Sequence, residues 1–332
     1  MRIVVAPDKF KGTASAREVS VAIASAVEAA GYSCTLVPMA DGGEGTLAAL
    51  GGANRSSLVT GPLGDPVNAE WRYDNGMAVL EMAQSSGLVL AGGKEENDPL
   101  RATTAGVGDL ISDAVDAGAT RIIIGVGGSA TTDGGLGAIE ALGGSAARLK
   151  GVELVVACDV RTLFVDAASV FGPQKGASRA QVAMLTRRLQ ALVETYRDRF
   201  GVDVSELERG GAAGGLAGGL AALGASLVDG FDIVAEVTEL NAALVGADLV
   251  ITGEGFLDEE SFNGKVVGGV ASLAANHGVP VLAVAGQVFD DVGGKVVAVS
   301  LTDEFGLEQA MAETTRSITT AVAACLHRRF GV

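Results

Sequence analysis

Hydrophobic and polar positions at the start of the chain follow the periods of strands and helices in turn. An apolar run at 3–6 predicts a strand, an amphipathic stretch at 14–31 predicts a helix, and a second apolar run at 34–39 predicts another strand. A short helix is expected from about Thr46. This β-α-β order is typical of a parallel sheet.

The pattern changes after residue 56. Three short segments with partial alternation, at 57–61, 67–74 and 77–83, are separated by the turns PLGDP and DNG. Sequential strands joined by tight turns predict an antiparallel section of sheet. Helices are then expected at 103–118, 136–142 and 178–200, with strands at 121–126 and 152–159. The apolar, glycine-rich stretch 210–225 is interpreted as packed loop and helix.

The last hundred residues return to a simple alternation of helices and strands. Helices are predicted at 233–246, 265–278 and 307–330, and strands at 248–253, 280–286 and 295–300. With the first two strands this gives five, the number in a flavodoxin-like doubly wound sheet of order 2-1-3-4-5. We therefore predict a discontinuous flavodoxin-like domain, 1–60 and 230–332, with an inserted α/β domain of mixed sheet, 61–229.

Composition narrows the class of protein. The 332 residues are 48% hydrophobic and 19% charged, which predicts a large core. A formal net charge of −16 argues against nucleic-acid binding, which needs a basic face. The chain shows neither a signal pattern nor an apolar run long enough to span a membrane, so we expect a cytoplasmic protein. Whether it is a monomer or a homodimer is left open.

Cysteine and histidine are sparse. Cys34, Cys158 and Cys325 lack the spacing of a zinc site and are expected to be free thiols. His277 and His327 both fall in helical stretches near the carboxyl end. This argues against a Ser-His-Asp hydrolase or a histidine-rich metal site.

Carboxylates and lysines stand beside glycines after three strands of the predicted doubly wound sheet. The segments are APDKFKG, PMADGGEGT and ITGEGFLDEESFNGK. Ligands of such sheets bind beyond the carboxyl ends of the strands. An acidic residue beside glycine is also common in turns and caps, but its repetition at three strand ends favours a site. The candidates are Asp8, Lys9, Lys11, Asp41, Glu44, Glu254, Asp258 and Lys265.

A second group of candidates lies in the predicted inserted domain. The turn GVGGSATTDGG follows a strand and precedes a helix, a setting in which backbone N–H groups can bind an anion. VFGPQKGAS places Gln174 and a lysine before another helix, and NDPLRATTAGVGDL opens a third, although an N-cap alone would explain its threonines. The candidates for binding substrate or phosphate are Arg101, Thr103, Thr104, Gly127, Gly128, Ser129, Thr131, Thr132, Asp133 and Lys175.

Together these groups suit phosphoryl transfer. Carboxylates can hold a divalent cation, and lysines with glycine turns can neutralise phosphate, so catalysis needs no histidine base. Neither the P-loop pattern nor the protein-kinase motifs are present.

The motifs, taken in order, closely resemble the glycerate kinase family over nearly the whole chain. The segments are APDKFKGTASA, PMADGGEGT, NDPLRATTAGVGDLI, GVGGSATTDGG, ACDV, VFGPQKGA, GAAGGL and GADLVITGEGFLDEESFNGKV. The resemblance implies phosphorylation of glycerate, usually the D isomer, with ATP and Mg²⁺, mainly to 2-phosphoglycerate. This sequence departs from the usual pattern of the family at 145–150, 161–169 and Phe256. The last two departures bear on substrate preference.

We hypothesise an active site in the cleft between the two domains. The catalytic residues would be Asp8, Lys9, Lys11, Asp41 and Lys265, and the Mg²⁺ ligands would come from Asp41, Glu44, Glu254 and Asp258. Asp8 or Asp41 would orient the hydroxyl and accept its proton. Arg101, Lys175 and the N–H groups of 127–129 are candidates for the glycerate carboxylate.

Two alternatives belong to other functional classes. Gly125-x-Gly127-x-x-Ala130 fits a relaxed Rossmann fingerprint, but the acidic residue expected about 20 positions later is missing, and Asp159 comes too late. A protein of the same fold could also bind glycerate without turnover. Release of ADP from Mg-ATP with D-glycerate separates both alternatives from a kinase.

Overall fold

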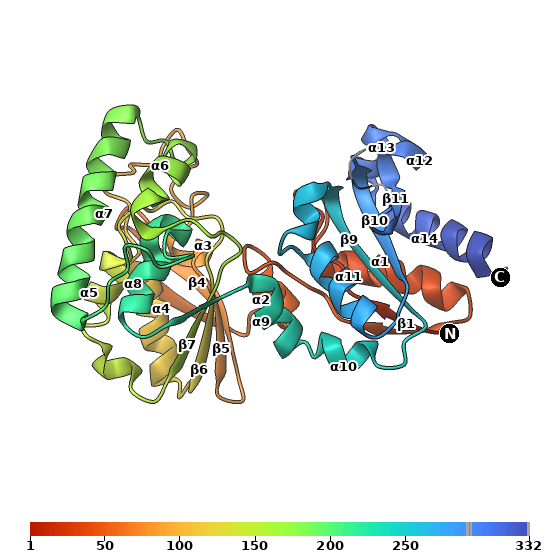
Figure 1. Ribbon diagram of the computed structural model, residues 1–332, viewed down its shortest axis with the longest axis horizontal. Helices are drawn as coiled ribbons and strands as arrows, with labels where there is room; N and C mark the ends of the chain where they lie inside the picture. The colour runs from red at the N-terminus through yellow and green to blue at the C-terminus, as the bar shows by residue number, and fades with distance from the viewer. Residues whose placement is uncertain (290–291, 293, 331–332) are drawn as a thin grey trace. The chain divides into compact units, whose positions relative to one another are not determined.

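The computed structural model describes residues 1–289, 292 and 294–330. The chain forms two compact units (Figure 1). Unit 1 comprises Met1–Asp41, Ala48–Leu50 and Phe231–Val332, and unit 2 comprises Gly42–Leu47 and Gly51–Gly230. Among the described helices, none combines the length and the apolar composition that crossing a membrane requires.

Unit 1 is built on a parallel sheet of five strands. In chain order they are β1 (Arg2–Val5), β2 (Ser33–Leu36), β9 (Leu249–Leu257), β10 (Val281–Val288) and β11 (Val297–Ser300). Their spatial order, β11-β10-β9-β1-β2, is the predicted 2-1-3-4-5, and every neighbouring pair is parallel. The flavodoxin-like fold class is confirmed.

Helices cover both faces of this sheet (Figure 1). Ile3 and Leu282 face a core that contains residues of α1 (Ala16–Ala29) and α14 (Thr314–Phe330). Ala283, one position along β10, packs with Val267 of α11 (Val266–Asn276) on the other face. The alternation follows from the period of two in a strand, and burial on both faces explains why these strands are continuously apolar.

Two helices predicted as continuous are interrupted. The stretch 233–246 divides into α9 (Gly230–Val237) and α10 (Leu240–Leu244), because Glu239 has a left-handed backbone with φ of 56° that a right-handed helix cannot include. The stretch 307–330 divides into α13 (Leu307–Ala312) and α14 at Glu313, whose φ of −123° is not helical. A further short helix, α12 (Leu301–Phe305), follows β11.

The sheet of unit 2 is mixed. It contains, in both sequence and spatial order, β3 (Arg55–Thr60), β4 (Pro66–Asp74), β5 (Met77–Glu81), β6 (Arg121–Gly125), β7 (Glu153–Ala157) and β8 (Ser226–Val228). The pairs β3–β4 and β4–β5 are antiparallel, as the turns predicted, and the remaining pairs are parallel. β3 lies in this sheet, although the predicted boundary at residue 60 would have placed it with the other unit. The sequence did not reveal β8.

Helices of unit 2 pack against this sheet and against one another. They are α3 (Ala83–Ser86), α4 (Ala105–Asp116), α5 (Leu136–Ala141), α6 (Ala167–Phe171), α7 (Arg179–Phe200) and α8 (Leu216–Ala222), while the short α2 (Thr46–Ala49) follows the second strand of the chain. Figure 1 shows α7 as a long helix along one side of unit 2. Its buried Tyr196 packs against Phe164 and donates a hydrogen bond of 2.9 Å to the carbonyl of Gly134. The core therefore reaches the glycine-rich turn and fixes it.

Candidate functional site

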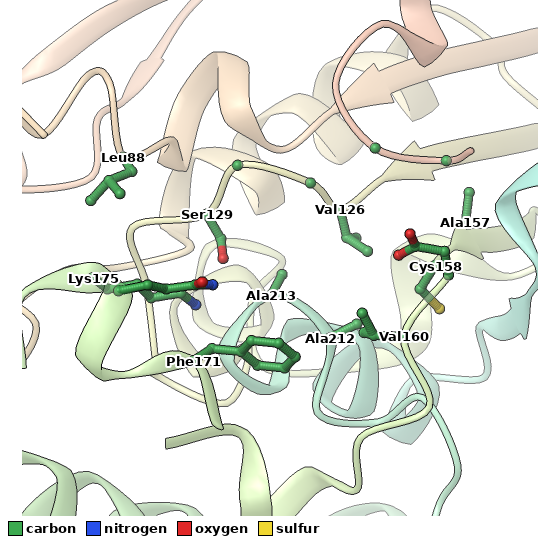
Figure 2. Close-up of a pocket in the computed structure, with 16 residues that line it drawn as sticks. Leu88, Val126, Ser129, Ala157, Cys158, Val160, Phe171, Lys175, Ala212 and Ala213 are labelled. Carbon is green, nitrogen blue, oxygen red and sulfur yellow. The ribbon is translucent and has the colours of Figure 1, made fainter. Parts of the chain in front are cut away.

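The parallel strands of unit 2 end together. Glu81, Gly125 and Ala157 are neighbours in register at the ends of β5, β6 and β7. A pocket of about 310 Å³ opens at this edge, where ligands of parallel sheets bind (Figure 2). It is lined by Gly42, Gly43, Leu88, Val126, Gly127, Gly128, Ser129, Ala157, Cys158, Asp159, Val160, Phe171, Gln174, Lys175, Ala212 and Ala213.

The glycine-rich turn after β6 forms one wall of the pocket. A Cβ atom on Gly127 would lie 2.7 Å from Gly43 Cα, and Gly128 has a left-handed backbone with φ of 70°, so both positions require glycine. The N–H groups of Gly127, Gly128 and Ser129 donate to no acceptor within the described residues. Successive free N–H groups around a left-handed residue form an anion-binding concavity.

Lys175 adds a positive group to the pocket. It is only 2% exposed, its Nζ donates a hydrogen bond of 2.6 Å to the carbonyl of Thr131, and the ring of Phe171 lies 6.0 Å away. Burial lowers the pKa of Lys175 to about 7, and the charge of Asp133 opposes this shift. Figure 2 shows Ser129 and Lys175 on the same side of the pocket. An anion bound there would stabilise the protonated amine.

Several predicted binding residues hold the turn rather than line the pocket. Asp133 accepts hydrogen bonds from the N–H and hydroxyl of Thr104, both 2.8 Å, and from the N–H groups of Gly135 and Gly137. Thr103 Oγ1 accepts from the N–H of Ala105 at 3.2 Å. The described geometry of these groups is that of helix starts and turns.

Three more predicted residues are absent from the lining of the pocket. The side chains of Thr131 and Thr132 are fully buried, and Arg101 is exposed. Their direct contact with substrate therefore stays a prediction.

Sequence reasoning missed two residues that position the pocket. Glu81 Oε1 accepts hydrogen bonds from the N–H groups of Gly45 (2.9 Å) and Leu47 (2.8 Å), and so holds the segment that carries two lining glycines. Asn97 Nδ2 donates to the carbonyls of Ala130 (3.0 Å) and Lys175 (2.8 Å). The sequence did offer an indication for Glu81, because it is an acidic residue at the end of a buried strand. For Asn97 the sequence offered no indication other than its position at the start of NDPLRATTAGVGDL.

The strand ends of unit 1 bring together a lysine and two carboxylates. Lys9 Nζ lies 3.6 Å from Asp8 Oδ1 and 3.9 Å from Asp41 Oδ1. Burial raises the pKa of Asp8 to about 6, with the charge of Lys9 opposing the rise and that of Asp41 adding to it. Three of the predicted catalytic residues are therefore neighbours.

Glu254 is a second buried carboxylate in unit 1. It is 9% exposed, and its Oε1 atom has no hydrogen-bond partner among the residues that the structure describes. Burial raises the pKa of Glu254 to about 7; the side chain of Ser261 opposes this rise, and the charge of Asp8 adds to it. The N–H of Asp8 also donates to the carbonyl of Gly253 at 2.8 Å, which ties the first strand end to the third.

The other candidates of the strand ends have more ordinary surroundings. Asp258 accepts a hydrogen bond of 3.1 Å from the N–H of Ser261 and caps the 3₁₀ turn Glu259–Phe262. Lys265 Nζ lies 3.7 Å from Glu260 Oε2, and Lys11 is exposed.

The Mg²⁺ ligand set of Asp41, Glu44, Glu254 and Asp258 stays a prediction. In the part of the chain that the structure describes, no three His, Cys, Asp or Glu side chains gather as metal ligands. Asp41 belongs to unit 1, whereas the exposed Glu44 belongs to unit 2. Mg²⁺ nevertheless needs only one or two carboxylates when phosphates and waters complete its shell. The buried, unpartnered oxygen of Glu254, with Asp8 near it, fits that requirement.

Unit 1 places buried carboxylates beside a lysine at the strand ends of a doubly wound sheet. Unit 2 adds a pocket whose N–H groups and lysine can bind an anion. These groups are of the kind that phosphoryl-transfer enzymes use. A sequence model described as the glycerate kinase family matches residues 3–147 and 144–328. Glycerate 2-kinase of Escherichia coli (strain K12) is 42% identical, over 88% of this chain and 87% of that protein. Glycerate kinase of Bacillus subtilis (strain 168) is 40% identical, over 88% and 86%.

A solved structure supports the same relationship. The crystal structure assigned as glycerate kinase 2 from Salmonella typhimurium LT2 is similar with a TM-score of 0.84 and 35% identity, and the match covers 99% of this chain and 98% of that one. The chain belongs to the glycerate kinase family.

Proposed function

We propose that this protein is an ATP-dependent glycerate kinase that transfers the γ-phosphoryl group to the 2-hydroxyl of D-glycerate. Family membership and the relatives named glycerate kinase support the reaction class. The observation that carries the proposal is the pocket in unit 2, where three free backbone N–H groups and the amine of Lys175 can meet an anion.

We assign the carboxylate of glycerate to this pocket. The N–H groups of 127–129 and Ser129 Oγ would donate to it, and Lys175 would add a charge-assisted hydrogen bond. Asp133, Thr104 and Asn97 then act as positioning residues, because they hold the turn and the lysine in place.

We assign the phosphates of ATP to the strand ends of unit 1. Asp8 and Glu254 would hold Mg²⁺, which supplies charge neutralisation of the phosphate oxygens. Lys9, Lys11 and Lys265 would neutralise the remaining charge. Asp41, beside Lys9, would orient the attacking hydroxyl and accept its proton late in the transfer.

The proposal makes both units contribute to one reaction, as the flavodoxin-like domain and its inserted domain. Its substrates are small molecules, glycerate and ATP, with no nucleic-acid or membrane partner. We further propose a cytoplasmic location, which suits the three free cysteines. The oligomeric state does not enter the mechanism.

The test measures ADP released from Mg-ATP with D-glycerate, with L-glycerate and the acid-free reaction as controls. Phosphorus–proton correlation in the NMR spectrum of the product then locates the phosphoryl group. We expect ADP with the D isomer and a phosphorus coupled to the C2 proton. ADP with another hydroxy acid but none with glycerate would keep the kinase and overturn the substrate, and absence of ADP with any acid would overturn the kinase.

A further inference from the structure

A small hollow lies in unit 1, beside the loop that follows β1 and at the carboxyl ends of β9 and β10. Its volume is about 60 Å³. Its lining includes Phe10, Lys11, Phe256, Gln287, Leu307 and Met311. The proposed function assigns no role to most of these side chains.

The rim of the hollow exposes large apolar side chains. Phe256 is 59% exposed, and Leu307 and Met311 of α13 are each 58% exposed. The ring of Phe289 lies 6.4 Å from that of Phe256, centroid to centroid, and is also exposed. Clustered exposed apolar groups mark interaction surfaces, and ligand-binding grooves are one kind of such surface. A flat ring can lie across this rim and cover the exposed apolar side chains.

A polar group at the same rim suits a nucleobase. Gln287 is the register partner of Phe256 on the neighbouring parallel strand. Its side-chain amide makes no hydrogen bond with any residue that the structure describes. An amide carries both a donor and an acceptor, and it can pair with the N6 amino group and ring nitrogen of adenine.

The hollow is also continuous with the groups assigned to the phosphates. Phe256 follows Glu254 by two residues, and Lys11 follows Lys9 by two residues. A Cβ atom on Gly255 would lie 3.5 Å from the backbone nitrogen of Lys11, so the two segments are neighbours. A nucleotide whose phosphates meet Lys9 and Glu254 would therefore carry its base toward Phe256.

We propose that this rim binds the adenine base, stacked on Phe256 and flanked by Met311. The inference rests on the proposed function and deepens it, because it places the whole nucleotide on unit 1 and leaves the pocket of unit 2 for glycerate. The occupant is a purine base, and stacking on an aromatic ring supplies the affinity.

The experiment compares Phe256→Ala and Met311→Ala with the control Met184→Ala, which truncates a methionine that is 48% exposed on α7 of unit 2. ADP and inorganic tripolyphosphate are titrated into each protein by calorimetry. We expect the first two variants to bind ADP about 5- to 50-fold more weakly while tripolyphosphate affinity and the KM for glycerate stay unchanged. Met184→Ala should match the wild type in all three measurements.

Selectivity among bases supplies a second measurement. Gln287→Leu removes the amide but keeps a side chain of similar size, and it should lower the ratio of ATP to GTP affinity at least fivefold. An unchanged ratio would remove Gln287 from the base subsite.

Other outcomes would overturn the inference as a whole. They are unchanged ADP affinity in both rim variants, an equal loss of tripolyphosphate affinity, or a change in sedimentation with ADP affinity unchanged, which would assign the rim to contact with a second copy. Failure of the proposed function is separate, since it is the absence of glycerate-dependent ADP release from the wild type.

Discussion

Lys175 shows how burial sets the chemistry of a single side chain. Its amine is surrounded by protein, hydrogen-bonded to one carbonyl and opposed by the charge of Asp133, and its pKa falls to about 7. A lysine in water would be charged throughout the physiological range. Here the amine loses its proton near neutrality unless an anion occupies the pocket.

Lys175→Met should impair glycerate binding without harming the fold. We expect kcat/KM for glycerate to fall about 100-fold, or about 2.7 kcal/mol, because a charge-assisted hydrogen bond is lost. The free energy of unfolding should stay equal or rise, since a buried amine is costly. Steady-state kinetics and urea unfolding measure the two effects, with the exposed Lys150→Met as control. Unchanged kinetics would remove Lys175 from the site.

The lowered pKa also predicts two dependences on pH. The KM for glycerate should rise about tenfold per pH unit above 7, because the neutral amine must take up a proton to bind the anion. Between about pH 7 and 10.5 the unfolded chain binds more protons at this residue than the native protein, so this contribution to stability rises with pH. Both trends should be absent from Lys175→Met, and their persistence would assign them to another group.

At the scale of elements, Asp133 joins two helix starts. Its Oδ2 atom accepts from the N–H and hydroxyl of Thr104 before α4 and from the N–H of Gly137 in α5. The hydroxyl of Thr104 in turn accepts from the N–H of Ala138. One carboxylate thereby satisfies donors at the amino ends of α4 and α5 and ties the end of the glycine-rich turn to both helices.

Asp133→Asn should therefore act on stability first. The amide nitrogen that replaces one oxygen cannot accept, so buried donors lose their partner at a cost of about 2 kcal/mol. Thermal and urea unfolding measure this loss, and Asp113→Asn, an exposed change on α4, is the control. A variant with native stability and a raised KM for glycerate would instead indicate that Asp133 contacts the substrate.

At the scale of the whole molecule, the proposal divides the reaction between two units. Unit 1 holds the carboxylates and lysines around Asp8, and unit 2 holds the pocket around Lys175. Substitutions in unit 1 should then change kcat, whereas substitutions in the pocket of unit 2 should change the KM for glycerate.

Asp41→Asn should lower kcat more than tenfold and leave the KM for glycerate nearly unchanged, because the change removes a proton acceptor but no carboxylate-binding group. Asp65→Asn, an exposed change in unit 2, serves as the control. A kcat within threefold of the wild type, less than 1 kcal/mol of barrier, would contradict the role.

The variant Asp8→Asn tests whether burial of the Asp8 carboxylate in unit 1 lowers the stability of the protein at neutral pH. Burial raises the pKa of Asp8 from 3.8 to about 6, so between these pH values the native protein binds more protons than the unfolded chain and this contribution to stability falls as pH rises. At pH 7 the neutral amide removes this penalty, so the variant should unfold at higher urea while its kcat drops. Lower stability in the variant would show that the charged form is favoured in the fold.

The sequence predicted residues that line the pocket of unit 2 only where residue chemistry and a local backbone signal occur in the same motif. Gly127, Gly128, Ser129 and Lys175 were found because glycine turns and a lysine before a helix are local patterns. Glu81 and Asn97 were missed, since their partners lie 36, 34, 33 and 78 residues away. Glu254 was a candidate metal ligand from its place near a strand end, but the sequence does not show that one of its oxygens is buried without a partner.

The sequence by itself determined the alternation of helices and strands, the doubly wound order of unit 1 and the family, because apolar periodicity and ordered motifs are local properties of the chain. Only the tertiary structure decided which residues line the pocket and which support it. Asp133 and Lys175 both stand in motifs that contain glycine, yet the Asp133 carboxylate accepts from four donors of the protein whereas Lys175 lines the pocket. Hydrogen-bond partners and desolvation arise when distant segments meet, so they are properties of the packed fold.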